Sequence, residues 1–313
     1  MSRIIAPIVT PLTPSGAVDE EGIRRVVEDL LSGGVDTIFA LGSTGRGPWF
    51  SPAQSRRILD TVTDAVRSYH TAGKPGADRV EFLAGCIGNG VEDMLSRAVT
   101  AAEAGADGVV ITAPGYFRYS WAEMESILTE VADRSPVPVF LYDIPSFTGF
   151  ELPQDLILNL MQHARFAGFK DSSANYDRFS AVLRLAPAGA LILQGKERLL
   201  CRSLEAGASG IVISAVHIAP RAFARLAEAV AAGDTGSLTE ARRIQGRIDE
   251  VMDLVEGIFE RRPETSSLFF FLQEVLVARG IDVSLALPFE GTCPVWITER
   301  ANRAVELLDG GPK

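Results

Sequence analysis

Cysteine and positive charge are both scarce in this chain of 313 residues. Its three cysteines, Cys86, Cys201 and Cys293, lie far apart and without a CxxC spacing. An odd number of scattered cysteines argues against a disulfide framework and against a zinc site, so we expect buried apolar thiols. The formal net charge is -10, and the sequence has no run of lysines or arginines. We therefore expect no nucleic acid among its partners.

A long hydrophobic run is also missing. A membrane-spanning helix needs about 18 apolar residues in succession, and the nearest candidate, FFFLQEVLVA after Leu268, is shorter. The first residues, MSRIIAPIVTPL, contain two prolines and no pattern of a signal-peptide cleavage site. We therefore predict a cytoplasmic protein with no membrane partner. Because 47% of the residues are hydrophobic and 22% are charged, we also expect a large buried core.

Short apolar runs alternate with longer amphipathic stretches over most of the chain. This alternation is typical of serial βα units. Eight runs have the length and composition of strands: Ile4–Leu12, Thr37–Leu41, Glu81–Gly85, Gly108–Thr112, Val137–Asp143, Phe166–Asp171, Ala190–Gln194 and Gly210–Ser214. Eight is the number of strands in a (β/α)8 TIM barrel. We predict an α/β fold of this class for residues 1–233.

Helical patterns fill the intervals between these runs, and several begin at serine, aspartate or proline. GGVDT, GADGV and GASGI each place a glycine between a helix and the next strand, as a helix C-cap requires. After Gly233 only helical patterns remain, at Leu238–Phe259, Ser266–Arg279 and Trp296–Leu308. We predict that residues 234–313 form a C-terminal helical segment that packs on the barrel or on a partner subunit. No cluster of chemically reactive residues lies in it.

A lysine ends the sixth apolar run, Phe166–Asp171. In a TIM barrel the active site lies at the carboxyl ends of the strands. A lysine in a partly apolar pocket loses proton affinity, and its neutral amine can attack a carbonyl to form an imine. A solvent-exposed Lys170 paired with Asp171 is the alternative, and its position alone does not separate the two interpretations.

Two neighbouring segments carry further candidate groups. Tyr142 ends the fifth run, next to the lysine strand, where a phenol can transfer protons; packing at the barrel rim is the alternative. After the second run, Gly42, Ser43 and Thr44 precede a helix that opens at Ser51. Backbone N–H groups and hydroxyls in such a loop can bind a carboxylate. The loop does not fit a nucleotide-binding spacing.

Histidine offers little support for a metal centre. The three histidines are scattered, and we predict no metal site. His217 alone follows a strand, in SAVHIAP, and we expect it to make a structural hydrogen bond.

The motifs GSTG, YDIPSFTG and GFKDSS, in this order and spacing, resemble the dihydrodipicolinate synthase and N-acetylneuraminate lyase family of class I pyruvate-dependent aldolases. The resemblance begins at IVTPLTPSGAVDEEGI and covers nearly the whole chain. It implies a (β/α)8 barrel with a helical C-terminal segment, a homotetramer, no metal and no external cofactor. Pyruvate would be held as a covalent lysine imine.

The resemblance also implies roles for individual residues. Lys170 matches the lysine that forms the imine, and Tyr142 matches the phenol that transfers protons. Ser43 and Thr44 match the pair that binds the carboxylate and relays protons. Tyr116 matches a tyrosine that reaches a neighbouring subunit's site in many members, and Ile213 matches a position whose backbone lies beside bound pyruvate.

Departures from the family pattern bear on the substrate. Phe147 stands where lysine-biosynthetic synthases carry an arginine for the carboxylate of aspartate semialdehyde, and a phenyl ring cannot make that contact. Arg46 stands where glutamate is common, and it could meet an acidic or polyhydroxylated substrate tail. Lys196 and Glu197 follow strand seven, where sugar-acid lyases place polar groups; a surface ion pair is the alternative.

We therefore predict a Schiff-base lyase, aldolase or dehydratase that acts on pyruvate or on a 2-keto-3-deoxy sugar acid. Two alternatives stay open. The first is 4-hydroxy-tetrahydrodipicolinate synthase, which joins pyruvate to aspartate semialdehyde. The second is a barrel that binds a small acid without catalysis.

Overall fold

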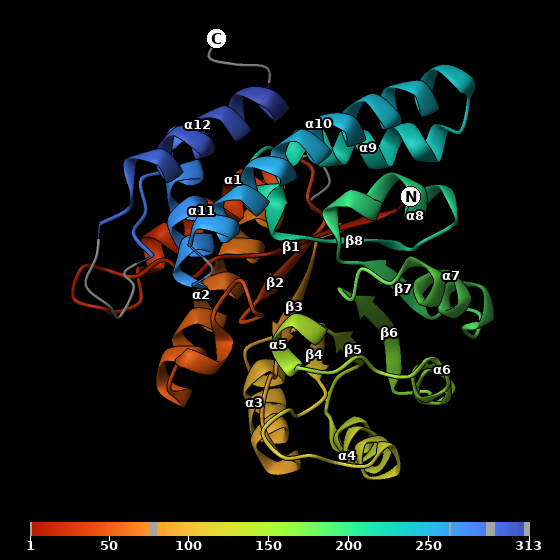
Figure 1. Cartoon of the computed structure of the whole chain (residues 1–313). Coiled ribbons are helices and arrows are strands. Elements are labelled where there is room, and N and C mark those ends of the chain that lie inside the picture. Colours follow the sequence, from red (N-terminus) through yellow and green to blue (C-terminus); the bar gives the residue numbers. More distant parts are fainter. Residues whose placement is uncertain (1, 75–79, 263, 286–291, 310–313) are drawn as a thin grey trace.

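A closed barrel of eight parallel strands forms the centre of the molecule, in the order β1 to β8 (Figure 1). The computed structural model describes residues 2–74, 80–262, 264–285 and 292–309. The strands are β1 (Arg3–Pro7), β2 (Thr37–Ala40), β3 (Glu81–Gly85), β4 (Gly108–Thr112), β5 (Val139–Asp143), β6 (Phe166–Asp171), β7 (Leu191–Gln194) and β8 (Gly210–Val212). The predicted fold class is confirmed.

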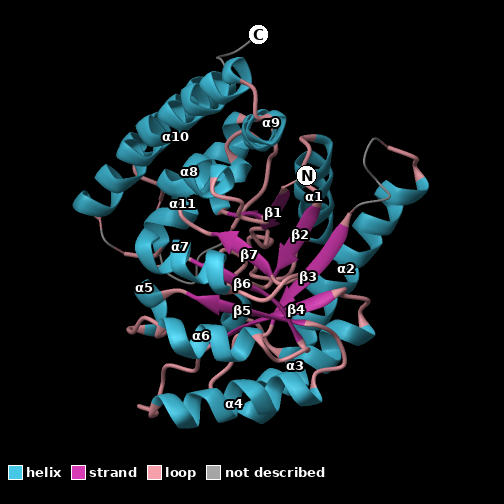
Figure 2. Ribbon diagram, turned by 90° about the vertical axis from the view of Figure 1, so that its right-hand side faces the viewer, coloured by secondary structure: helices cyan, strands magenta, loops and turns pink. Residues whose placement is uncertain are grey.

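The strands are apolar on both faces because helices cover the outside of the barrel (Figure 2). Inward side chains from most of the strands fill the interior, and outward side chains pack against the helices. The buried residues of the interior are Ile5, Phe39, Leu83, Val110, Phe140, Tyr142, Ile144, Leu193 and Val212. Because side chains alternate along a strand, a residue two positions from a member of this set also faces the barrel interior.

The first strand is shorter than predicted. The apolar run Ile4–Leu12 suggested nine residues in the sheet, but β1 ends at Pro7. Ile8 still donates its N–H to the carbonyl of Phe39, and Leu12 pairs with Val18 in an isolated antiparallel bridge. The run stays buried beyond the strand because it crosses the end of the barrel, so hydrophobicity alone marks the strand end poorly.

Local sequence signals define the helices between the strands. Ser51 and Gln54 form a capping box at the start of α2, and Ser120 and Glu123 form one at the start of α4. The helices are α1 (Glu20–Ser32), α2 (Pro52–Thr71), α3 (Val91–Glu103), α4 (Trp121–Arg134), α5 (Pro145–Thr148), α6 (Gln154–Met161), α7 (Tyr176–Leu185), α8 (Leu200–Glu205) and α9 (Pro220–Ala232), with 3-10 turns η1 (Gly47–Trp49), η3 (Glu197–Leu199) and η4 (Ser214–His217).

Three glycines link helices to strands in the same conformation. Gly34, Gly105 and Gly207 have φ of 96°, 94° and 97°. They belong to the three repeated motifs GGVDT, GADGV and GASGI. A left-handed residue after a helix favours glycine because it has no Cβ, so the repeated motif has a conformational cause.

Three helices complete the chain: α10 (Thr235–Arg261), α11 (Ser266–Ala278) and α12 (Val295–Asp309). They gather beside α9 on one side of the barrel (Figure 1). Arg279, just after α11, forms an ion pair of 2.7 Å with Asp29 of α1. The division of the chain at residue 233 stays an interpretation. Within the described ranges, no helix is both long and apolar enough to span a membrane.

Candidate functional site

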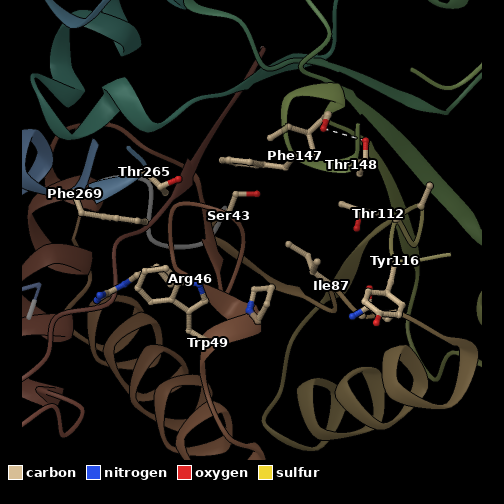
Figure 3. Close-up of a pocket in the computed structure, with 16 residues that line it drawn as sticks. Ser43, Arg46, Trp49, Ile87, Thr112, Tyr116, Phe147, Thr148, Thr265 and Phe269 are labelled. Atoms are coloured by element: carbon tan, nitrogen blue, oxygen red, sulfur yellow. Dashed lines mark hydrogen bonds between the residues drawn. The ribbon is translucent and has the colours of Figure 1, made fainter. Parts of the chain in front are cut away.

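Two adjoining cavities open at the carboxyl ends of the strands. The inner cavity has a volume of about 610 Å³ and is lined by Lys170, Tyr142 and Thr44, among others. The outer cavity, about 520 Å³, is shown in Figure 3 and is lined by Trp49, Thr112 and Tyr116, among others. Ser43, Ile144, Phe147, Thr265 and Phe269 line both. The shared residues make the two cavities parts of one cleft.

Lys170 points into the barrel from the end of β6. Its side chain alternates with outward-facing Phe169, and it is only 6% exposed. The Nζ atom lies 3.8 Å from the centroid of the Tyr142 ring and 5.5 Å from that of Phe39. Burial lowers the pKa of Lys170 to about 7; Glu197 opposes this shift and Lys196 adds to it. A large share of the amine is therefore uncharged near neutral pH.

Gly195, at the end of β7, allows the lysine side chain to lie where it does. A Cβ at this position would lie 2.2 Å from Ser172 Oγ and 3.2 Å from Lys170 Cε. The first contact forces Ser172 Oγ to move, and the second crowds the Lys170 side chain, so a larger residue would disturb both.

We expect Gly195→Ala to lower the rate of imine formation by about 10²-fold, because small displacements of a reacting group have large kinetic costs. Crowding should also reduce stability by roughly 1–3 kcal/mol. Gly90→Ala is the control, since no atom lies within 4 Å of a Cβ there. Borohydride trapping of the pyruvate adduct and urea unfolding measure the two effects. A variant that traps pyruvate at the wild-type rate would contradict the argument.

Tyr142 faces Lys170 across the β5–β6 ladder, where the two residues are partners in register. Burial raises the pKa of Tyr142, and hydrogen bonds with Ser172 and Ser43 partly oppose this. The phenol is therefore protonated and can donate a proton to a reacting group. Ser172 is a site residue that the sequence reasoning missed. Its signal was strand alternation, because Ser172 follows Lys170 by two positions and faces the same side.

The loop after β2 has a tightly folded backbone. Leu41 and Arg46 have positive φ values of 56° and 57° although neither is glycine. A Cβ on Gly42 would lie 2.7 Å from the Phe39 ring. The loop places Ser43 between the two cavities and Thr44 on the inner one. Strained backbone of this kind is common where a protein holds functional groups in place.

Arg46 lies in this loop, but its guanidinium is buried. It donates to the carbonyls of Leu285 and Thr10, both at 2.6 Å. The rings of Trp49 and Phe269 lie 5.5 Å and 5.2 Å from its Cζ. Arg46 borders the outer cavity, yet the predicted contact with a substrate tail would have to compete with these two hydrogen bonds.

Three other predicted site residues lie around the cleft. Ile213 is buried beside the inner cavity. Phe147, on α5, is 59% exposed and lines both cavities. Tyr116 is 77% exposed and lies at the margin of the outer cavity. In Figure 3, Ile87 lies between Tyr116 and Ser43. Its role in a neighbouring subunit stays a prediction.

The C-terminal helices also line the cleft. Met252, Val255 and Glu256 of α10 border the inner cavity, as do Leu268 and Leu272 of α11. The helical segment, predicted to pack on the barrel or on a partner subunit, therefore also forms a wall of the cleft. The cleft is thus lined partly by residues far along the chain from Lys170.

Lys196 and Glu197 line the inner cavity instead of forming a surface pair. Both are half-buried, and no ion pair joins them in the described part of the chain. Burial raises the pKa of Glu197. The alternative of a surface ion pair is thus wrong, and both residues face the space next to Lys170.

His217 is fully buried, and both nitrogens of its ring contact backbone groups. Its Nδ1 lies 2.8 Å from the carbonyl oxygen of Ser214, and its Nε2 accepts the N–H of Val9 at 3.4 Å. Burial lowers the pKa of His217 to about 4, so the ring is neutral near pH 7. These contacts match the expected structural hydrogen bond. Over the described ranges, His, Cys, Asp and Glu form no group of three that could hold a metal ion.

Relatives of known name resemble the chain over most of its length. The 4-hydroxy-tetrahydrodipicolinate synthase 1 of Streptomyces coelicolor is 32% identical over 234 residues, which cover 75% of this chain and 73% of that protein. The 4-hydroxy-tetrahydrodipicolinate synthase of Kineococcus radiotolerans is 33% identical over 258 residues, covering 82% and 78%.

Solved structures share the fold at lower identity. YagE, a prophage protein of Escherichia coli K12 solved in complex with pyruvate, superposes with a TM-score of 0.86 at 23% identity, covering 99% of each chain. CdNal from Clostridium difficile, in complex with mannosamine, superposes with a TM-score of 0.84 at 17% identity, covering 98% of this chain and 99% of that one. The model of the dihydrodipicolinate synthetase family matches residues 1–287. The chain therefore belongs to the dihydrodipicolinate synthetase family, whose members are class I aldolases and lyases.

Proposed function

We propose that the protein cleaves or forms a carbon–carbon bond next to a 2-oxo acid through an imine on Lys170, with pyruvate or a 2-keto-3-deoxy sugar acid as substrate. The observation that carries the proposal is the buried amine of Lys170 against the Tyr142 ring in a cleft. A lysine with a pKa of about 7 is a nucleophile at neutral pH without a metal or an external cofactor.

The reaction begins when the neutral amine attacks the 2-oxo carbon. The carbinolamine then loses water, because Tyr142 donates one proton to its leaving hydroxyl group. The resulting iminium withdraws electrons from C3, so the C3–C4 bond breaks as the C4 hydroxyl loses its proton and becomes an aldehyde. Protonation of the enamine at C3 and addition of water to the imine release pyruvate and restore Lys170. Loss of a C4 hydroxyl from the same type of enamine would give dehydration instead.

The remaining groups of the cleft have supporting roles in this proposal. The loop of Ser43 and Thr44 binds the substrate carboxylate through hydroxyl and backbone donors. Ser43 also hydrogen-bonds Tyr142, so it can pass the phenol's proton on. Ile213 supplies an apolar wall beside the bound ketoacid. We propose a homotetramer in the cytoplasm, with Tyr116 reaching the neighbouring site.

A second candidate is 4-hydroxy-tetrahydrodipicolinate synthase, favoured by the names of the relatives at 32% and 33% identity. Phe147 argues against it, because its ring cannot form an ion pair with the carboxylate of aspartate semialdehyde. A third candidate, of another class, is a barrel that binds a small acid without turning it over. The joint presence of Lys170, Tyr142 and Ser43 argues against a simple binder.

Two measurements test the proposal. Sodium borohydride with pyruvate should leave a reduced adduct on the peptide that contains Lys170, as detected by mass spectrometry. A panel of 2-keto-3-deoxy acids, assayed for pyruvate release, then identifies the substrate, with pyruvate plus aspartate semialdehyde as the competing assay. Binding of pyruvate without an adduct would favour the non-catalytic barrel.

We expect the rate of imine formation to rise tenfold per pH unit below about pH 7 and to level off above it. The sign follows because the protonated amine cannot attack, and protons leave Lys170 as the pH passes its pKa of about 7. Stopped-flow measurements with pyruvate give this profile. Glu197→Gln should move the inflection to lower pH, because Glu197 raises the pKa of Lys170. An inflection near the ordinary lysine pKa, about 10.4, would contradict the burial argument.

A further inference from the structure

The residues that follow Tyr142 and Lys170 form a second pair behind the site. Asp143 and Asp171 are partners in register on β5 and β6, as Tyr142 and Lys170 are. Strand alternation turns the two carboxylates away from the barrel interior, toward the helices. Both aspartates are almost fully buried. Two buried carboxylates side by side repel each other and need a common cation.

Arg178 of α7 supplies that cation. Its Nη2 lies 2.7 Å from Oδ2 of Asp143 and 3.0 Å from Oδ2 of Asp171, so a single nitrogen bridges the two strands. Its Nε lies 3.2 Å from Glu151, and its Nη1 donates to the carbonyl of Leu152. The Arg178 side chain is 7% exposed. Each nitrogen of the guanidinium thus lies close to an oxygen, but Nε of Arg178 and Oδ2 of Asp143 have no hydrogen-bond geometry, so charge alone holds them. A flexible ammonium could not reproduce this fork.

Stability alone does not account for such a cluster. Buried ion pairs lose hydration, and apolar side chains of similar volume often replace them at no net cost in stability. Here three carboxylates surround one guanidinium, and burial raises the pKa of Asp143 to about 6 even though Arg178 opposes the shift. The cluster fixes the relative position of two strand ends, because it joins the end of β5, which carries Tyr142, to the end of β6, which carries Lys170.

We propose that Arg178 is a positioning residue that holds the ends of β5 and β6 together, so that the Tyr142 phenol stays aligned with the imine on Lys170. The inference rests on the proposed imine chemistry. The Tyr142 ring centroid lies 3.8 Å from Nζ, and a displacement of about 1 Å can cost about 10²-fold in rate. Arg178 contacts neither reacting group, so it acts only through the two aspartates.

The test compares Arg178→Met, Arg178→Lys and Asp143→Asn with the wild type. Arg184→Met is the matched control, because Arg184 lies exposed on the same helix. For each protein, the number of sites that borohydride traps with pyruvate is counted, and kcat per trapped site and KM are measured with the substrate from the panel. We expect Arg178→Met to lower kcat per trapped site by about 10- to 100-fold with little change in KM. Arg178→Lys should recover part of the loss, and Arg184→Met should match the wild type.

The readout separates positioning from folding. If Arg178→Met only reduces the folded fraction, the number of trapped sites falls while kcat per trapped site stays at the wild-type value, and the proposal is overturned. If Arg178→Met does not fold, Asp143→Asn decides, since it removes the charge that attracts Arg178 to β5 and keeps the side-chain shape. Unchanged kcat per trapped site would then overturn the proposal. Wild-type protein that turns over substrate without any trapped adduct would instead refute the imine chemistry itself.

Discussion

Replacement of Lys170 by methionine should abolish both the borohydride adduct and turnover, with kcat reduced on the order of 10⁴-fold or more. The reason is that Lys170 is the buried amine of the inner cavity, whereas Lys196 is only half-buried. Methionine keeps the apolar volume of the side chain, so the barrel should fold and remain at least as stable, because a costly buried amine is removed. Steady-state kinetics, mass spectrometry after borohydride, and thermal unfolding measure the three properties.

Lys196→Met is the matched control for this experiment. Lys196 also lines the inner cavity, but it is only half-buried and lies on the loop after β7. The Lys196→Met variant should still form the borohydride-trapped pyruvate adduct on Lys170. If the adduct instead disappears in Lys196→Met and persists in Lys170→Met, the nucleophile has been assigned to the wrong lysine.

Replacement of Tyr142 by phenylalanine should lower kcat by about 10²- to 10⁴-fold, the range typical of a lost proton-transfer group. The variant keeps the ring against Nζ and removes only the hydroxyl that bonds Ser43 and Ser172. Pyruvate should still be trapped by borohydride, but more slowly, because the leaving hydroxyl of the carbinolamine must then take its proton from water. Single-turnover kinetics separate the two steps.

Tyr119→Phe provides the corresponding control. Tyr119 packs partly buried against the core and lies outside the residues that line either cavity. The Tyr119→Phe substitution should leave kcat unchanged. A Tyr142→Phe enzyme with a wild-type rate of cleavage would show that another group, with Ser43 and Glu197 as candidates in the cleft, moves the proton.

Much of the barrel could be predicted because its strands are buried on both faces and separated by amphipathic helices. Three strands, β3, β4 and β6, have the predicted bounds. The strand ends elsewhere were less certain, as Leu12 illustrates, because a residue can be buried over the end of a barrel without belonging to the sheet. Hydrophobic patterns record burial and carry no information about hydrogen-bonding partners.

The amino-acid sequence alone determined the barrel and the placing of Lys170 and Tyr142 at adjacent strand ends, because period, strand count and chain order are local properties that a linear pattern retains. Only the tertiary structure determined the pKa of Lys170, the helices that line the cleft, and the groups that Arg46 and Arg178 bind. These features arise from contacts between residues distant in sequence, such as Arg46 with Leu285. Burial and charge at one atom depend on all the neighbours that folding brings together, so no local pattern could reveal them.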